Sequence, residues 1–541
     1  MKVVIIGGVA SGMSAAARLR RLREDADITV YEMAEHVSYA NCGLPYFVSD
    51  VISRREALLL QTPKSLWDRF RISVHVKHRV VSINRQTKTV SVQNLSTNET
   101  FEDSYDFLVI TTGAKPKRPA VPGIERALEL RNVTDADAIK AAIAEAQTSS
   151  AAILGGGFIG IELAENLRHL GLEVSVIQRG TQVLSQVDPE IAKPLEIRLR
   201  SNDVSIEFDA DVSRISEDAV LLSDGRTIAA GLVFIAAGVE PDNALAREAG
   251  LRIGTTGGLW VDSRQVTSDP SILAAGDAVE KHGELTGDSS LIPLANLANR
   301  HGRLIADVIA GRDVHAHSAL STAIIGAFGL AVGVTGLTEK SAILNNIQHQ
   351  VIHTHPNNHA GYYPGSTRVS LKVLFDPITG RLLGAQAVGE DGVDKRIDVL
   401  ATAIRNQMTV DDLMDLELSY APQFGSAKDA INIVGYVGNN VWTGTTPTVQ
   451  WHELDQAASG GALLVDVRSK AEHESGSIPG SVNIPVDEIR DRLSELSEKE
   501  VVVYCAVGQR GHIATQILKA SGIKVKNLDG GFSTWSLATK S

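Results

Sequence analysis

"KVVIIGGVASGM", residues 2–13, joins an apolar run to a glycine turn. The apolar run predicts a buried parallel strand, and residues 10–22 predict the helix that follows it. Gly7 would make the tight turn, and Gly12 would let the helix pack closely on the sheet. A pyrophosphate could then lie at the helix N-terminus, where free N–H groups and the helix dipole favour negative charge. The stretch therefore predicts a dinucleotide-binding fold.

An acidic residue supports this interpretation. Glu32 ends a second predicted strand, DITVYEM (residues 27–33), and lies 20 residues beyond Gly12, where a carboxylate can bind ribose hydroxyls. Val9 stands where the motif usually has its middle glycine. The order of strand, turn, helix and acid still makes the motif specific.

The same pattern recurs about 150 residues later. AAILGGGFIGIELAENLRHLG (residues 151–171) carries a complete glycine set and is followed by another predicted strand, EVSVIQR (residues 173–179). The set consists of Gly155, Gly157 and Gly160, with Glu162 on the predicted helix. The chain therefore contains two dinucleotide-binding units.

The second unit lacks the acid at the end of its second strand, where Gln178 and Arg179 stand instead. A carboxylate there would bind a ribose 2′-hydroxyl and repel a 2′-phosphate, whereas Arg179 could pair with the phosphate. This substitution favours NADPH, or tolerance of both nicotinamide cofactors. A solvated arginine at the surface is the alternative.

Bulk properties restrict the class of protein. A chain of 541 residues should form three or four domains, and a hydrophobic fraction of 43% is typical of soluble globular proteins. The formal net charge of −12, without long runs of either sign, argues against a nucleic-acid binder. The sequence shows no signal peptide and no apolar run of the roughly 18 residues that a bilayer span requires. Two cysteines cannot form a disulfide framework, so we expect a cytoplasmic protein without membrane association, in which each thiol is chemical.

The remaining chain changes pattern twice. VSLKVLFDPITGRLLGAQAVG (residues 369–389) alternates and turns at residues 376–380, as an antiparallel hairpin would. Residues 438–450, rich in Gly, Asn and Thr, predict a linker. Beyond it, strand and helix patterns start again and predict a small α/β domain.

Two dinucleotide folds in one chain, together with TTGAKP (residues 111–116) and AAGDA (residues 274–278), resemble the two-nucleotide flavoprotein disulfide reductases over about residues 1–440. The resemblance implies FAD in the first site and NAD(P)H in the second. It implies that Asp277 binds the flavin ribityl chain and that a helix beginning near Pro293 faces the flavin ring. The other cofactor-binding residues that it implies are Ala10, Val80, Thr111, Thr112, Gly113, Arg131, Gly276 and Ala295 for FAD, and Ile159 and Gly238 for the nicotinamide.

Cys42, in SYANCGLPYF (residues 38–47), has no neighbouring cysteine, although paired-cysteine reductases carry two in this region. A lone thiol must take its sulfur or oxygen partner from the substrate. It either becomes a sulfenic acid or forms a mixed disulfide or persulfide. A buried structural cysteine is the remaining alternative, but the surrounding turn-rich, polar sequence disfavours it.

SYANCGLPY resembles the coenzyme A disulfide reductases and their persulfide-reducing relatives, as do HAGYYPG (residues 359–365), VDKRIDVLATAI (residues 393–404) and YAPQFGSAKD (residues 420–429). The resemblance implies a homodimer in which Tyr362 and Tyr420 reach the partner's cysteine site, where a phenol can donate a proton to the leaving sulfur. Interface packing is the alternative role for both tyrosines. The residues implied to hold coenzyme A are Ser14, Arg18, Arg21, Ser38, Asn41, Asn299 and Lys428, although arginines on a helix are often only a solvated face.

Cys505 follows a predicted strand in VVVYCAVGQRG (residues 501–511). A six-residue loop, Cys505, Ala506, Val507, Gly508, Gln509 and Arg510, leads into a helix, so backbone N–H groups can converge on the sulfur and stabilise an anion. With LLVDVRS (residues 463–469) and LDGGFSTW (residues 528–535), the segment resembles a rhodanese domain. Asp466 and Arg468 would be structural in that fold.

The expected architecture is α/β with two Rossmann-like domains, an α+β dimerisation domain and a rhodanese domain. Its expected boundaries are 1–112 and 241–320 for FAD, 113–240 for NAD(P), 321–444 for dimerisation and 450–541 for rhodanese. The expected activity is reduction of coenzyme A persulfide, polysulfide or disulfide by NAD(P)H, without a metal. A peroxidase or oxidase with a Cys42 sulfenic acid and a redox-sensing interaction protein are the alternatives.

Overall fold

A computed structural model of the protein describes residues 1–146, 148–496 and 499–539. The chain forms two compact units. Unit 1 consists of residues 1–181 and 199–319, and unit 2 consists of residues 182–198 and 320–541. Along the part of the chain that is described, no helix combines the length and apolar character needed to cross a membrane.

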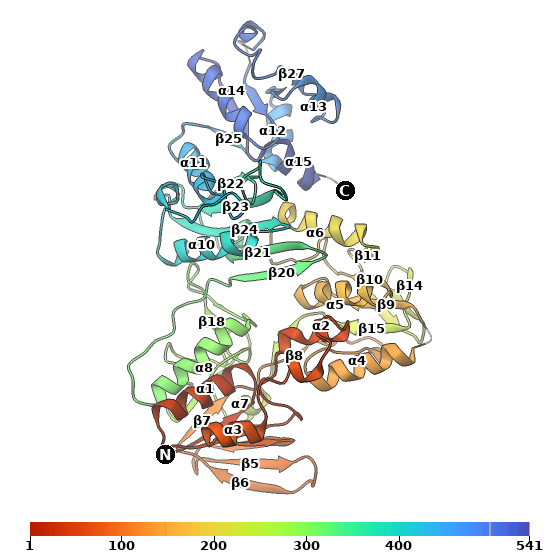
Figure 1. Ribbon diagram of the computed structural model, residues 1–541, viewed down its shortest axis with the longest axis vertical. Helices are drawn as coiled ribbons and strands as arrows, with labels where there is room; N and C mark the ends of the chain where they lie inside the picture. Colours follow the sequence, from red (N-terminus) through yellow and green to blue (C-terminus); the bar gives the residue numbers. More distant parts are fainter. Residues whose placement is uncertain (147, 497–498, 540–541) are drawn as a thin grey trace. The chain divides into compact units, whose positions relative to one another are not determined.

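The first sheet of unit 1 contains five parallel strands in the order β17-β7-β1-β2-β3. The strands are β1 (Lys2–Ile6), β2 (Asp27–Glu32), β3 (Ser73–Val76), β7 (Phe107–Ile110) and β17 (Ile272–Ala274). Apolar residues bury both faces of β1, as a parallel sheet covered by helices requires. The predicted helix is confirmed as α1 (Ala10–Leu22), and α8 (Ala295–Ile309) packs along it (Figure 1).

The second sheet repeats this design with four parallel strands in the order β11-β10-β9-β15. Its strands are β9 (Ser150–Leu154), β10 (Glu173–Ile177), β11 (Val204–Glu207) and β15 (Leu232–Ile235), with helices α4 (Val133–Glu145) and α5 (Phe158–His169). The segments that leave β7 and β15 pair with each other as β8 (Ala114–Pro116) and β16 (Val239–Pro241). Both predicted nucleotide-binding folds are therefore present and are joined by a two-stranded connection.

Smaller elements complete unit 1. One three-stranded antiparallel sheet consists of β4 (His78–Asn84), β5 (Thr89–Asn94) and β6 (Thr100–Ser104). A second consists of β12 (Val212–Ile215), β13 (Ala219–Leu222) and β14 (Thr227–Ala229). A short two-stranded ribbon consists of β18 (Lys281–His282) and β19 (Ser289–Ser290). Three short helices are α2 (Leu44–Val48), α3 (Pro63–Phe70) and α7 (Ala244–Glu248).

Unit 2 contains an antiparallel sheet in the order β20-β21-β24-β23-β22. Its strands are β20 (Ala323–Ala327), β21 (Leu330–Gly336), β22 (Gln350–Thr354), β23 (Val369–Phe375) and β24 (Leu382–Gly389), accompanied by α6 (Pro189–Ser201), α9 (Glu339–Leu344), α10 (Val393–Arg405) and α11 (Ala430–Trp442). The predicted hairpin is confirmed, because the Gly380 N–H donates to the Asp376 carbonyl between β23 and β24.

The second sheet of unit 2 is parallel, in the order β25-β29-β28-β26-β27. Its strands are β25 (Thr448–Val449), β26 (Leu463–Asp466), β27 (Val482–Asn483), β28 (Val501–Tyr504) and β29 (Val525–Leu528), with helices α12 (Leu454–Ser459), α13 (Lys470–Glu474), α14 (Gln509–Ala520) and α15 (Gly531–Thr539). The predicted C-terminal α/β domain is therefore present.

The linker predicted over residues 438–450 is wrong in its first part. Helix α11 continues through Trp442, and its Gly438 packs against Val410 and Ile352. Glycine there permits close packing, a role that composition alone cannot distinguish from flexibility. Residues 443–447 form the connection to the C-terminal domain, whose sheet includes β25 from Thr448.

Candidate functional site

The first glycine turn is fixed by steric contacts. Gly7 has a φ of +99°, and a Cβ atom there would lie 2.3 Å from the Thr111 carbonyl oxygen. A Cβ at Gly12 would lie 2.0 Å from the Gly7 carbonyl oxygen. Only glycine fits either position, so α1 can begin directly behind the turn.

The start of α1 can accept an anion. Val9 and Ala10 occupy the cap and first positions of the helix, and no side chain caps its free N–H groups. Glu32 is buried beside the turn, where its carboxylate accepts hydrogen bonds of 2.8 Å from the N–H groups of Gly8 and Ala34. The carboxylate therefore lies next to the glycine turn, where the sequence predicted a ribose contact.

The predicted flavin acid lies at the end of β17. Burial raises the pKa of Asp277, and the charge of Lys281 opposes that shift. Within the described ranges, the Asp277 carboxylate accepts no hydrogen bond, so a polyol hydroxyl would satisfy it. Gly276 precedes it with a φ of +83°, and Ala295 begins α8. The helix predicted near Pro293 is thus confirmed two residues later.

The other predicted FAD residues lie around the connection between the two parallel sheets. Thr111 donates to the Ile6 carbonyl at 2.8 Å, Thr112 donates to the Asp242 carbonyl at 2.5 Å, and nothing lies within 4 Å of a Cβ built at Gly113. That open space fits the close approach of a cofactor. Val80 is buried in β4, where its contacts are those of a core residue.

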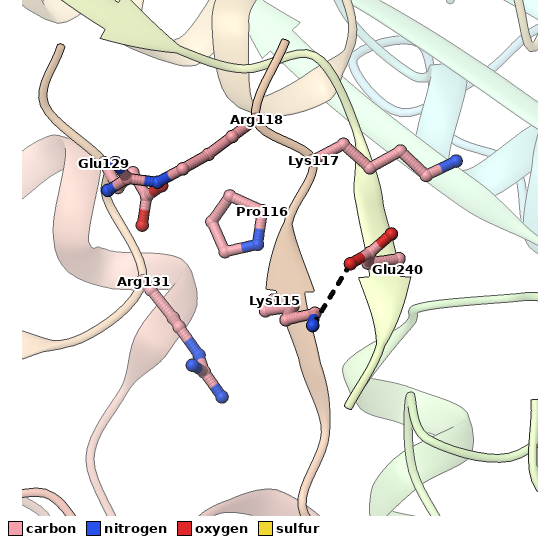
Figure 2. Close-up of a pocket in the computed structure, with 7 residues that line it drawn as sticks. All are labelled: Lys115, Pro116, Lys117, Arg118, Glu129, Arg131 and Glu240. Carbon is pink, nitrogen blue, oxygen red and sulfur yellow. Dashed lines mark hydrogen bonds and ion pairs between the residues drawn. The ribbon is translucent and has the colours of Figure 1, made fainter. Parts of the chain in front are cut away.

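Arg131 contributes to a polar pocket of about 580 Å³ beside β8 and β16. Figure 2 shows the ion pair between Lys115 and Glu240 that crosses these two strands. The guanidinium of Arg131 is 3.8 Å from Asp242, a distance that leaves it able to bind another anion. The full lining is Lys115, Pro116, Lys117, Arg118, Glu129, Arg131 and Glu240.

The second glycine turn repeats the first. A Cβ at Gly155 would lie 2.3 Å from the Ala236 carbonyl oxygen, and one at Gly160 would lie 1.9 Å from the Gly155 carbonyl oxygen. Gly157 and Gly238 have no atom within 4 Å of a built Cβ, and Gly157 caps α5 without a side-chain bond. Gly155 and Gly160 are thus required by close backbone packing, whereas Gly157 and Gly238 face open space. Ile159 is partly exposed on the first turn of α5.

Gln178 and Arg179 differ in their contacts. The Gln178 side-chain oxygen accepts a 3.0 Å hydrogen bond from the Gly156 N–H. Arg179 is exposed and pairs with no carboxylate among the residues that the structure describes. Its guanidinium is therefore available for a phosphate.

Cys42 lies in a short 3₁₀ turn, Asn41–Gly43, and is a free, exposed thiol. Partial desolvation and the carboxylates of Glu162 and Asp277 raise its pKa. Glu162, on α5, has its own pKa raised to about 7 by burial and by Glu165. The bare protein therefore disfavours a thiolate at Cys42, and Glu162 can hold a proton near neutral pH.

The residues predicted to hold coenzyme A do not all lie free. Arg18 forms an ion pair of 2.8 Å with Asp307, so it connects α1 to α8. Arg21 lies over the ring of Phe70, with 5.6 Å from its guanidinium carbon to the ring centroid. Arg18 is thus already paired with a carboxylate. The sequence could not show this ion pair, because Asp307 lies far from Arg18 along the chain.

Four of the predicted polar residues lie on α1, on α8 or in the segment that leads into the Cys42 turn. The Ser14 hydroxyl donates to the Asn299 side-chain oxygen at 2.6 Å. Asn41 is exposed beside Cys42, with 3.8 Å between its side-chain oxygen and the sulfur. Ser38 has a φ of +47° and donates its N–H to the Gly8 carbonyl. Asn41 can therefore form hydrogen bonds with a polar substrate near the thiol.

Tyr362 and Tyr420, in unit 2, lie together at the surface. Their hydroxyl oxygens are 3.1 Å apart, and their exposed fractions are 77% and 50%. The Ala360 N–H donates to the Gly425 carbonyl at 3.0 Å and joins the two loops. Such exposure of paired aromatics indicates an interaction surface. Lys428 is exposed in the second loop.

Cys505 is fully buried at the end of β28, and its sulfur accepts a 3.2 Å hydrogen bond from the Gly508 N–H. Gly508 has a φ of +95° and caps α14. Of the predicted convergence on the sulfur, the described residues show one backbone N–H group, and the Arg510 side chain adds its positive charge and a hydrogen bond. Ala506, Val507, Gln509 and Arg510 form the rest of the loop.

Two contacts that stabilise the surroundings of this loop could not be found from the sequence. Glu472 forms two hydrogen bonds of 2.7 and 2.6 Å with the Arg510 guanidinium. His353 contacts Asp529, and the residues just after Asp529 form hydrogen bonds with the backbone of Cys505 and Ala506. Neither contact has a local sequence signal. Asp466 and Arg468 form a buried ion pair of 2.6 Å, in agreement with a structural role.

Comparisons with known proteins match this architecture along the chain. Residues 1–302 match the family model of pyridine nucleotide-disulphide oxidoreductases, residues 322–430 match the dimerisation domain of that family, and residues 450–538 match rhodanese-like domains. Coenzyme A disulfide reductase from Staphylococcus epidermidis is 33% identical over 436 residues, which are 80% of this chain and 99% of that protein.

Two solved structures extend the similarity to the C-terminal domain. Reduced Bacillus anthracis CoADR-RHD shares 45% identity with a TM-score of 0.98, covering 99% of this chain and 98% of that one. An NAD-dependent persulfide reductase from A. fulgidus shares 35% identity with a TM-score of 0.92, covering 99% of this chain and 100% of that one. The chain therefore belongs to the FAD-dependent pyridine nucleotide-disulphide oxidoreductases, which use NAD(P)H, and it carries a C-terminal rhodanese domain.

Proposed function

We propose that this enzyme reduces coenzyme A persulfide, and also polysulfide or coenzyme A disulfide, with electrons from NAD(P)H and with Cys42 as its redox-active thiol. The observation that carries the proposal is the exposed, unpaired Cys42 at the glycine-turn end of unit 1. The similar proteins are named as a coenzyme A disulfide reductase and a persulfide reductase, which supports sulfur reduction here.

The proposed reaction begins when the Cys42 thiol loses its proton and attacks the outer sulfur of the persulfide, and coenzyme A leaves as its thiol by taking up that proton. Cys42 then carries the persulfide. Two electrons from NAD(P)H, which FAD bound at the first glycine turn would relay, and two protons would convert the Cys42 persulfide to the Cys42 thiol and hydrogen sulfide. In sum, coenzyme A persulfide, NAD(P)H and one proton give coenzyme A, hydrogen sulfide and NAD(P)⁺. Glu162, whose pKa is raised to about 7 and whose charge acts on Cys42, would hold one of the protons.

The C-terminal domain would load sulfur. We propose that Cys505 takes the outer sulfur of a donor such as thiosulfate, which leaves as sulfite, and that the resulting Cys505 persulfide passes this sulfur to coenzyme A, which regenerates the Cys505 thiol and gives coenzyme A persulfide. The Gly508 N–H and the start of α14 would stabilise the sulfur anion. We also propose a cytoplasmic homodimer, in which Tyr362 and Tyr420 of one subunit serve the Cys42 site of the other.

The test compares turnover with coenzyme A persulfide, coenzyme A disulfide and hydrogen peroxide, for the native enzyme and for Cys42→Ser. The variant should keep its FAD, because the predicted FAD residues do not include Cys42, and should lose at least about 100-fold in persulfide turnover. Near-normal persulfide reduction by the variant would refute the role of Cys42. Faster turnover of peroxide than of any sulfur substrate would favour a peroxidase.

A further inference from the structure

His353 joins the two sheets of unit 2 from a buried position. It lies on β22, with its Nδ1 atom 2.6 Å from a carboxylate oxygen of Asp529. Its Nε2 atom lies 3.1 Å from a carboxylate oxygen of Glu190 on α6. His353 is 4% exposed, and both carboxylate residues are 3% exposed. A ring held by two buried carboxylates is fixed in orientation.

The residues that follow Asp529 support the Cys505 loop directly. The Phe532 N–H donates to the Cys505 carbonyl at 2.8 Å, and the Ser533 N–H donates to the Ala506 carbonyl at 2.9 Å. A Cβ built at Gly531 would lie 2.4 Å from the same Cys505 carbonyl. The turn after Asp529 therefore touches the backbone of the loop without intervening side chains.

The same turn packs closely on β22. A Cβ built at Gly530 would lie 2.7 Å from the Cβ of His353. His355, just beyond β22, places its Nε2 atom 2.8 Å from the Thr534 hydroxyl on α15. The Cys505 loop is thus held through one short turn by the dimerisation sheet.

The charges around His353 favour its cationic form. Burial alone would lower its pKa, but the hydrogen bonds and charges of Asp529 and Glu190 raise it to about 9. Beyond these two carboxylates lie Asp188 and Glu339, both bonded to the Lys372 ammonium, which also contacts Glu190. On the other side, His355 has its pKa lowered to about 3 by burial and by the charges of His353 and Arg368. The cluster holds four carboxylates, so the His353 cation offsets buried negative charge.

We propose that His353 is a positioning residue for sulfur transfer: through Asp529 it fixes the turn that sets the backbone of the Cys505 loop. The inference rests on the proposed role of Cys505 in sulfur transfer. It implies that the rhodanese domain depends on the dimerisation domain for the geometry of its reactive loop. A domain tied only by a flexible linker would not show this dependence.

The experiment uses the full-length holoenzyme and the variants His353→Gln, Asp529→Asn and their combination. Each is assayed for sulfur transfer from thiosulfate to cyanide, and for NAD(P)H-dependent persulfide reduction as a measure of intact folding. Alkylation of Cys505 by iodoacetamide is followed from pH 5 to pH 10 in a Cys42→Ser background, so that Cys505 is the only thiol. Gln450→Ala is the matched control, since Gln450 also bonds β22, at the Val351 carbonyl, but does not touch the loop.

For His353→Gln we expect the kcat of sulfur transfer to fall at least about tenfold with KM changed less than about threefold, because small misplacements of reacting groups are costly. The dependence of the Cys505 alkylation rate on pH should differ from that of the native sequence at position 353, while persulfide reduction stays near normal. Asp529→Asn should cause a similar loss, and the double variant should be no worse than either single variant, because both act through one contact. Gln450→Ala should leave the alkylation profile unaltered.

Unchanged kcat and alkylation in His353→Gln would overturn the proposal. So would equal losses of sulfur transfer and persulfide reduction, which would indicate general destabilisation. If His353→Gln alone is poorly folded, the double variant tests the proposal in its place, because it also removes the negative charge of Asp529 that the substitution of His353 leaves without its partner. Absence of sulfur transfer in the native enzyme would instead refute the role of Cys505, and the alkylation profiles would still test the positioning.

Discussion

At the scale of single residues, the glycines of the second turn differ in what they do. Gly160 is in contact with backbone, whereas Gly157 faces open space where a cofactor would lie. Gly160→Ala should therefore destabilise the fold by several kcal/mol, because the contact is with a backbone oxygen that cannot move freely. Gly157→Ala should leave the thermal midpoint within about 2 °C but raise KM for NAD(P)H about tenfold. Thermal unfolding and steady-state kinetics measure the two effects. A Gly157→Ala enzyme with normal KM would contradict the predicted nucleotide contact.

Arg179 allows a prediction about cofactor choice. Its side chain is exposed, and Gln178 supplies no negative charge. NADPH should therefore be used at least comparably to NADH, and Arg179→Ala should lower kcat/KM for NADPH about five- to tenfold while changing NADH little. Both values come from parallel assays with the same sulfur substrate. A native preference for NADH above about tenfold, equivalent to roughly 1.4 kcal/mol, would show that Arg179 does not bind the 2′-phosphate.

At the scale of elements, local patterns predicted the structure wherever the reason was local. The strand–turn–helix units follow from apolar runs and from glycine spacing within one motif, as at Gly12, where a Cβ would meet the carbonyl oxygen of Gly7 five residues earlier. Contacts between distant segments left no signal of this kind. Arg18 pairs with Asp307, and His353 pairs with Asp529, across 289 and 176 positions of the chain. Only the packing of α1 on α8, and of β22 on the C-terminal domain, brings these groups together.

The connection between the sheets of unit 2 is more restrained than its composition suggests. Thr446 is buried, and its hydroxyl lies 2.6 Å from the His512 Nδ1 atom. Lys519 donates to the carbonyls of Gly444 and Thr445, and the Asn527 N–H donates to the Pro447 carbonyl. Segments tied by several such bonds open rarely.

Limited proteolysis tests this restraint. Subtilisin, which accepts most sequences, should leave residues 443–449 intact while exposed loops are cut, and mass spectrometry of the fragments identifies each site. Thr446→Gly/Lys519→Ala removes two of the ties and should make this segment a cleavage site. Early cleavage there in the native protein would mean that the C-terminal domain is a free module.

At the scale of the whole molecule, the proposal draws one active site from two chains. Tyr362 and Tyr420 are exposed in unit 2, whereas Cys42 is exposed in unit 1. In a two-fold dimer, each tyrosine pair can serve the thiol of the other subunit. A dimer of this kind has two equivalent sites, each built from both chains.

Mixed dimers distinguish this arrangement from one in which each chain acts alone. One subunit carries Cys42→Ser, and the other carries Tyr362→Phe and Tyr420→Phe. If the tyrosines act across the dimer, a mixed dimer contains one site with both an intact thiol and an intact tyrosine pair. Because random assembly makes half of the dimers mixed, the co-expressed sample should recover about one quarter of native persulfide reductase activity, well above either parent. If the tyrosines act within their own chain, no site gains both groups, and the sample should show only the average of the two parents. Tandem affinity tags isolate the mixed dimer itself, which should then reach about half of the native activity, because only one of its two sites is complete.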